Sequence, residues 1–209
     1  MTSYPLMMSA TLPVTENAIA VTQGFLRWHR TAAELMITDS DGHTVPHPIT
    51  ALGYVSPKDA LKCSHSYSLN GRFGHDIETD AAFVQHCSSS QVDIGVFRET
   101  YVILAGRATV NGICRSASVL FVARDDAFLP WNMIITATHE YRDPVRQQTS
   151  DFAIDYHFEH QTPLPYEWKT FIPGLTMWMH GNLVGRDEET RRFIVTVTDY
   201  SIVDCDGPK

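Results

Sequence analysis

Arginine and aromatic side chains stand close together at three separate places in this chain. The densest place lies near the start of the chain and holds two rings and two guanidinium groups: Phe25, Arg27, Trp28 and Arg30. A guanidinium group binds phosphate oxygens bidentately, and an aromatic ring stacks on a nucleobase for about 1–3 kcal/mol per base. These residue types at this spacing favour a surface for single-stranded nucleic acid, provided that the side chains face solvent together.

Two further places repeat the combination with fewer members. Their candidate residues are Arg107, Arg115, Trp178 and Arg186. Trp178 alternates with Thr176 and His180 and would face outward from a strand, although a tryptophan in a barrel strand is often a core residue. Arg191 and Arg192 follow two glutamates, and a solvated, self-neutralised turn explains them better than a binding role. We therefore expect the place around Trp28 to be the strongest of the three.

Thiolate and imidazole groups, which are the usual ligands of zinc, gather between residues 63 and 87. The candidates are Cys63, His65, His86 and Cys87. Their spacing contains no CxxC pair and no HxxxH pair, and the adjacent His86 and Cys87 would point to opposite faces of a strand. A polar loop with unrelated histidines and cysteines explains them better than a metal site.

A second metal hypothesis concerns Asp155, His157 and Glu159, whose side chains could hold a divalent cation. The apolar residues around them alternate with polar ones: Phe152, Ile154, Tyr156 and Phe158. This alternation predicts a half-buried strand with the three polar residues on its outer face. A solvated strand face accounts for them without a metal.

The common motifs of nucleophilic and nucleotide-dependent catalysis do not occur in the sequence. There is no GxSxG elbow, no P-loop and no GxGxxG. We therefore expect no catalytic residue and no cofactor. A non-enzymatic binding module is favoured over a metal-dependent enzyme.

Composition limits the fold and the partners. The chain has 209 residues, 44% of them hydrophobic, which suffices for one sizeable core or two small ones. Its formal net charge of −8 does not steer it toward a polyanion, so that a nucleic-acid surface would have to be a local patch. No secretory leader and no apolar run of the roughly 20 residues that span a bilayer is visible. We expect an intracellular protein with reduced thiols and no membrane partner, in the nucleus or the cytoplasm.

Strands are expected to carry most of these residues. Asn111-Gly112 between two apolar runs predicts a tight hairpin. Ser56 followed by Pro57 predicts the start of a short helix, and residues 79–87 predict two helical turns. Residues 1–15 carry two prolines and several hydroxyl residues, and we interpret them as a flexible N-terminal arm.

Residues 173–204 form two strand-like runs joined by a charged turn, with Gly181 inside the first run. Such a pattern is typical of the first hairpin of a small closed barrel, in which a mid-strand glycine allows sharp coiling and the approach of a ligand. The stretch resembles the OB-fold over about 35 residues. The residues that carry the resemblance are Pro173, Gly174, Gly181, Leu183, Gly185, Phe193, Ile194, Val195 and Val197. It is similar to the barrels of fungal transposon-associated proteins and, more distantly, to single-strand DNA-binding subunits.

The resemblance implies an all-β fold, an OB-like Greek-key barrel with elaborations and one or two short helices. One barrel-type domain over residues 16–209 is expected, with two tandem small barrels over residues 16–125 and 126–209 as the alternative. The expected partner is single-stranded DNA or RNA. The alternative function is a protein-interaction barrel that docks another chain or a second copy of itself, which the acidic balance favours.

Overall fold

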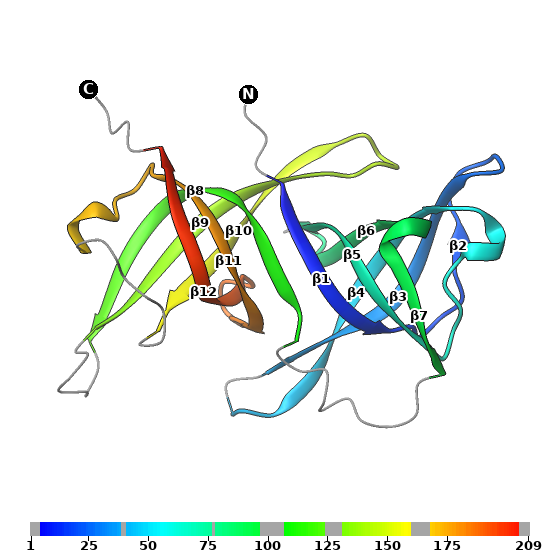
Figure 1. Ribbon diagram of the computed structural model, residues 1–209, viewed down its shortest axis with the longest axis horizontal. Coiled ribbons are helices and arrows are strands. Elements are labelled where there is room, and N and C mark those ends of the chain that lie inside the picture. Colours follow the sequence, from blue (N-terminus) through cyan, green and yellow to red (C-terminus); the bar gives the residue numbers. More distant parts are fainter. Residues whose placement is uncertain are drawn as a thin grey trace.

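Strands dominate this computed structural model, which describes residues 5–38, 41–76, 78–96, 107–123, 131–159 and 168–204. They form two rings that lie side by side in Figure 1, with β1 to β7 in one and β8 to β12 in the other. The expectation of an all-β protein is confirmed. The short helical segments of the described residues are three-residue 3-10 helices at Pro57–Asp59, Ser88–Ser90 and Trp168–Thr170, and the first begins at Pro57 after Ser56, as the sequence predicts. No helix among them is long and apolar enough to cross a membrane.

The first ring is built from five main strands. They are β1 (Leu6–Pro13), β3 (Arg27–Thr38), β4 (Thr44–Val55), β5 (His65–Asp76) and β6 (Ala81–Cys87). The order around the ring is β1-β5-β6-β4-β3, and a bridge between Val14 and Ala33 brings the chain after β1 against β3. Two short strands flank it: β2 (Ile19–Ala20) pairs with β3, and β7 (Gln91–Val96) pairs with β5.

The second ring closes completely. Its strands are β8 (Thr109–Ala123), β9 (Trp131–Arg142), β10 (Thr149–Phe158), β11 (Thr176–Arg186) and β12 (Phe193–Asp204). The pairing runs β8-β9-β10-β12-β11 and returns to β8. In both rings the first strand lies beside the second and the fourth, and the third runs parallel to the fifth. This is the five-stranded Greek-key order of an OB barrel.

Alternation of apolar and polar residues builds the core of each ring. In β10 the residues Phe152, Ile154, Tyr156 and Phe158 are at most 2% exposed, which confirms the half-buried strand that their spacing predicts. The buried apolar residues of the two rings form one continuous core cluster.

The prediction of a flexible arm at residues 1–15 is wrong. Leu6–Pro13 forms β1, in which Leu6, Met8 and Leu12 are fully buried. The prolines that suggested a loop lie at the ends of this strand, where a missing amide hydrogen disrupts little of the ladder. β1 also pairs with both β5 and β8, so that it joins the two rings.

The predicted hairpin at Asn111-Gly112 is also wrong, because both residues lie inside β8. Gly112 pairs with Leu6 on one side and with Met179 on the other. A Cβ atom at Gly112 would stand 2.7 Å from the carbonyl oxygen of Pro5. The glycine therefore serves the close approach of strands at the junction of the rings and not a turn.

Three further expectations need correction. Residues 79–87 form no helix: Ala81–Cys87 is the strand β6. The C-terminal hairpin exists, but β11 and β12 are the fourth and fifth strands of their ring and not its first two. A division at residue 125 would separate β8 from β9, which pair along most of their length.

Candidate nucleic-acid interface

The outer face of β3 and β4 carries an aromatic pair. Trp28 and Tyr54 are direct partners in the antiparallel ladder, and their ring centroids are 5.2 Å apart at an interplanar angle of 43°. Tyr54 is 44% exposed, and Trp28 is half-buried. In an OB barrel the face of the second and third strands, which β3 and β4 are here, is where oligonucleotides bind. Two rings at this spacing offer base-sized flat surfaces to solvent.

The segment before β3 extends the apolar part of this face. The backbone N–H of Trp28 donates to Thr22 Oγ1 at 2.8 Å, and its carbonyl accepts from the N–H of Val21 at 2.9 Å. These bonds fold residues 19–26 back along β3. Phe25 at their tip is 78% exposed, and Ile19 and Leu26 are also exposed. Phe25 is therefore an exposed ring in the segment that leads into β3, three residues before Trp28.

Arg30 lies two residues beyond Trp28 on the same side of β3, because side chains alternate along a strand. It lines a groove of about 320 Å³ between the first ring and the turn that joins β9 to β10. Phe83 and Arg146 line the same groove. The ring of Phe83 stacks on Tyr141 at 5.6 Å, which holds the β9–β10 hairpin against the first ring. The guanidinium groups of Arg30 and Arg146 thus line one groove, together with the carboxylate of Asp143, which lies 3.9 Å from Arg146 Nε.

Arg27 does not share this face. It alternates with Trp28 and lies on the same side of β3 as His29, which is buried inside the ring. Burial and the neighbouring Arg27 charge lower the pKa of His29. His86 lies close by across Gly53, and burial lowers its pKa to about 4. Arg27 therefore belongs to a buried polar cluster, and the sequence cluster around Trp28 divides between two faces.

The candidate zinc ligands are spread over different environments. The thiol of Cys63 donates to the carbonyl of Thr15 at 3.1 Å, and His65 Nδ1 contacts Asp93 at 3.0 Å. His86 points into the ring, whereas Cys87 is exposed on its outside. Hydrogen bonds from Ser89 and Ser90 lower the pKa of the Cys87 thiol to about 7. Across the described ranges no group of three or more potential ligands is placed to hold a metal ion, and this includes Asp155, His157 and Glu159.

A second aromatic patch lies on β11 and β8. Trp178 faces outward, as its alternation predicts, and its ring stacks on His180 with centroids 6.1 Å apart. Ile113 is the ladder partner of Trp178, and Arg115 follows on the same side of β8. The structure therefore brings Trp178 and Arg115 together from distant parts of the sequence. This patch lies on the first and fourth strands of its ring and not on the second and third.

Of the two roles that the sequence suggests for Gly181, the structure supports tight coiling and not the approach of a ligand. Gly181 faces the interior of β11, and a Cβ atom there would stand 2.3 Å from the carbonyl oxygen of Thr196. The ladder shifts register between His180 and Gly181. The glycine therefore allows β11 and β12 to coil tightly, and it leaves no opening for a ligand.

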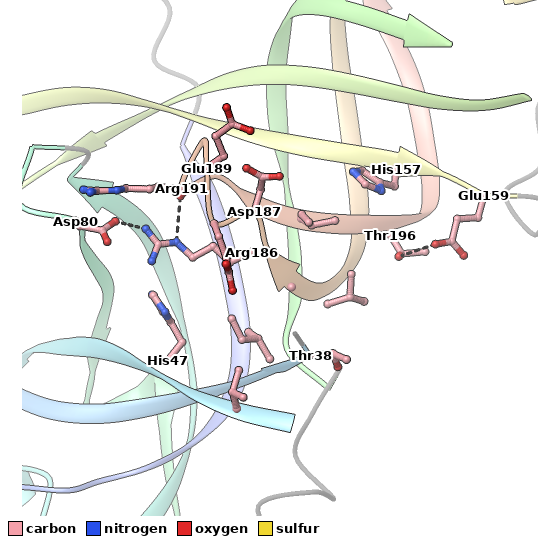
Figure 2. Close-up of a pocket in the computed structure, with 16 residues that line it drawn as sticks. Thr38, His47, Asp80, His157, Glu159, Arg186, Asp187, Glu189, Arg191 and Thr196 are labelled. Atoms are coloured by element: carbon pink, nitrogen blue, oxygen red, sulfur yellow. Dashed lines mark hydrogen bonds and ion pairs between the residues drawn. The ribbon is translucent and has the colours of Figure 1, made fainter. Parts of the chain in front are cut away.

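Arg186 holds the two rings together. Its guanidinium forms an ion pair with Asp80 of the first ring and donates from Nε to the carbonyl of Arg191 at 3.1 Å (Figure 2). Asp80 also contacts His75 Nε2 at 3.0 Å. These partners occupy Arg186, which makes it a contact between rings. Arg107, by contrast, is exposed at the entry to β8.

A cleft of about 1230 Å³ opens beside this ion pair, between the tip of the β3–β4 hairpin and the ends of β10, β11 and β12. Figure 2 shows His47 and Thr38 on one side of it and Asp187, Glu189, His157 and Glu159 on the other. Burial and the neighbouring Arg186 charge lower the pKa of His47 to about 4. The pKa of His157 is also lowered by burial.

Some of the interface could not be found from the sequence. Tyr54 is far from Trp28 in the chain and meets it only through the β3–β4 register, and Phe83 shares a groove with Arg30 only through the packing of the β9–β10 hairpin. Arg146 belongs to the other ring. A correct assignment of the β3–β4 hairpin register would have identified Tyr54, because the register determines which residues lie opposite each other on the two strands.

The strand pairing of this chain defines its class: two OB-type barrels in one polypeptide. The chain is similar to the solved structure of the wild-type single-stranded DNA binding protein from Thermus aquaticus, at 13% identity and a TM-score of 0.48 over 99% of this chain and 95% of that one. A deletion mutant of that protein gives 15% identity and a TM-score of 0.48 over 98% of this chain and 96% of that one. No protein-family model matches the sequence, and no curated protein sequence does.

Proposed function

We propose that the protein binds single-stranded nucleic acid, without catalysis, on the outer face of β3 and β4. The observation that carries the proposal is the pair of half-buried Trp28 and exposed Tyr54 on the second and third strands of the first barrel. Bases would stack on these rings and on Phe25. Phosphates would follow the groove past Arg30 to Arg146.

The second barrel does not repeat this face. Its second and third strands, β9 and β10, place polar and acidic residues outward, with Thr136 opposite Asp155 and Glu140 opposite Asp151. Asp155 is paired with Arg192, whereas the exposed Asp151 opposite Glu140 presents negative charge that repels a phosphodiester chain. The binding site therefore occupies one barrel, and this agrees with a net charge of −8 for the whole chain.

Fluorescence anisotropy of labelled single-stranded DNA and RNA oligonucleotides at low salt tests the proposal. The native protein should bind, and Trp28→Ala should bind roughly 5- to 150-fold more weakly, because one stacking platform is lost. Trp178→Ala removes another half-buried tryptophan, which lies on a different face, and should bind as the native protein does. Absence of binding at tens of micromolar would refute the function, because even non-specific contacts register there.

Self-association is a second candidate function, favoured by β7. Val92, Ile94 and Val96 alternate along this strand, and each is about 60% exposed. Within the described residues β7 pairs only with β5, so that its other edge is available to β7 of a second copy. Light scattering should show a dimer that Ile94→Lys dissociates and that Val203→Lys, on β12, leaves intact. A monomeric native protein at every concentration would exclude this candidate.

A further inference from the structure

The cleft between the barrels has an apolar floor. Ile37 and Val45 come from the tip of the β3–β4 hairpin, and Val184 and Ile194 come from β11 and β12. At about 1230 Å³ the cleft exceeds the usual size of a small-molecule site, which is about 300–1,000 Å³. Its dimensions and its position between two sheets suit an extended chain segment with apolar side chains.

The rim of the cleft is acidic. Five carboxylates line it, and only two guanidinium groups accompany them: Asp80, Glu159, Asp187, Glu188 and Glu189 against Arg186 and Arg191. Arg186 is already paired with Asp80, so that the remaining charge is strongly negative. Glu188 and Glu189 are exposed on the turn after β11 and face solvent at the mouth.

The histidines do not reverse this charge. His47 lines the cleft, is only 9% exposed, and its Nε2 atom has no hydrogen-bond partner in the described part of the chain. Its pKa of about 4 keeps the ring neutral at neutral pH. His157, which lies among Asp155, Glu159 and Asp187, also has a lowered pKa. The cleft therefore presents negative charge, a neutral imidazole and an apolar floor.

We propose that this cleft binds a basic segment of another polypeptide, in which lysine or arginine side chains alternate with apolar ones. The apolar side chains would lie on the floor, and the cationic groups would pair with the carboxylates of the rim. Nucleic acid is excluded from the cleft by the same charge. The cleft also lies at the opposite end of β3 from Trp28, roughly 30 Å away at about 3.3 Å per residue. The inference does not depend on the nucleic-acid function.

The test uses the full chain and a labelled peptide that alternates lysine with leucine. Anisotropy should show binding that weakens with added salt, whereas a peptide that alternates glutamate with leucine should not bind. The double variant Glu188→Gln, Glu189→Gln should bind the lysine peptide about tenfold more weakly. The matched control is Glu16→Gln with Glu78→Gln, which makes the same change of net charge at exposed residues outside the cleft and should bind as the native protein does.

Three results would overturn the proposal. They are equal binding by the two double variants, equal binding of the acidic peptide, and no binding of the lysine peptide at tens of micromolar. Displacement of the peptide by a single-stranded oligonucleotide would also count against it, because that would make the cleft part of the nucleic-acid surface. Oligonucleotide binding by itself is measured separately, so that failure of one proposal leaves the other intact.

Discussion

At the scale of single residues, the function depends on which face of a strand each side chain occupies. Trp28 and Arg30 face outward from β3. Arg27, although adjacent to Trp28 in sequence, lies on the opposite side of the strand with the buried His29. The aromatic partner of Trp28 is Tyr54, which no local pattern in the sequence singles out. The candidate surface therefore combines residues from several segments. Its affinity for an oligonucleotide should depend on the aromatic ring of Tyr54 and not on the hydroxyl group of that residue.

This dependence can be measured at Tyr54. Tyr54→Phe keeps the ring beside Trp28 and should leave oligonucleotide affinity within about twofold of the native value, whereas Tyr54→Ala should weaken it roughly 5- to 150-fold. Anisotropy titrations at fixed salt give the comparison. Equal losses for both variants would show that the hydroxyl group, and not stacking, carries the contact.

At the scale of elements, β1 and β8 decide how the two barrels join. Each strand belongs to its own ring, and they also pair with each other at Leu6 and Gly112. At Gly112 the backbone of Pro5 and Leu6 passes so close to β8 that a Cβ atom would stand 2.7 Å from the carbonyl oxygen of Pro5. The β9–β10 hairpin adds a second contact, in which Gln85 Nε2 donates to the carbonyl of Arg142 at 2.9 Å.

A side chain at Gly112 should therefore be costly. Gly112→Ala places a methyl group against the backbone of Pro5 and Leu6 and should lower the free energy of unfolding by about 1–3 kcal/mol. Urea denaturation measures the change. The neighbouring Asn111→Ala, which alters an outward side chain of the same strand, should change stability by less than about half as much. If the two variants are equally stable, the close approach at Gly112 carries no strain.

At the scale of the whole molecule, buried histidines couple stability to pH. His47 lies beside the contact between the rings, and His86 lies inside the first ring. Both have a pKa of about 4 in the folded protein against 6.5 for an ordinary histidine, chiefly because burial disfavours the charged ring. In the window between these values the unfolded chain binds more protons than the folded chain.

Stability should therefore be full above about pH 6.5 and fall as the pH approaches 4, by up to roughly 3 kcal/mol for each of the two groups. Urea unfolding at pH 7 and at pH 4.5 measures the loss. His47→Gln and His86→Gln should each flatten the dependence, since glutamine does not titrate. The carboxylates with lowered pKa values, such as Asp80 and Asp187, add their own loss only at lower pH. A stability that is constant from pH 7 to pH 4.5 would contradict the assignment.

The sequence by itself determined the all-β class and the positions of most strands. Period-two alternation in residues 149–158 and 176–186 is a local property that any amphipathic strand must show, and it survives in the structure. The same local reasoning failed at residues 6–13 and at Asn111-Gly112. There the local structure depends on partners that are distant in sequence. Residues 6–13 are a strand although prolines flank them, and Gly112 lies against the backbone of Pro5 and Leu6.

Only the tertiary structure decided which residues form the candidate sites. Three contacts join segments that are distant in the chain. Trp28 packs beside Tyr54, Arg30 and Arg146 line one groove, and Arg186 forms an ion pair with Asp80. The physical reason is that strand register and ring closure set the neighbours of each side chain. These are global properties, whereas the spacing of residues along the chain records only which face of its own strand each one occupies.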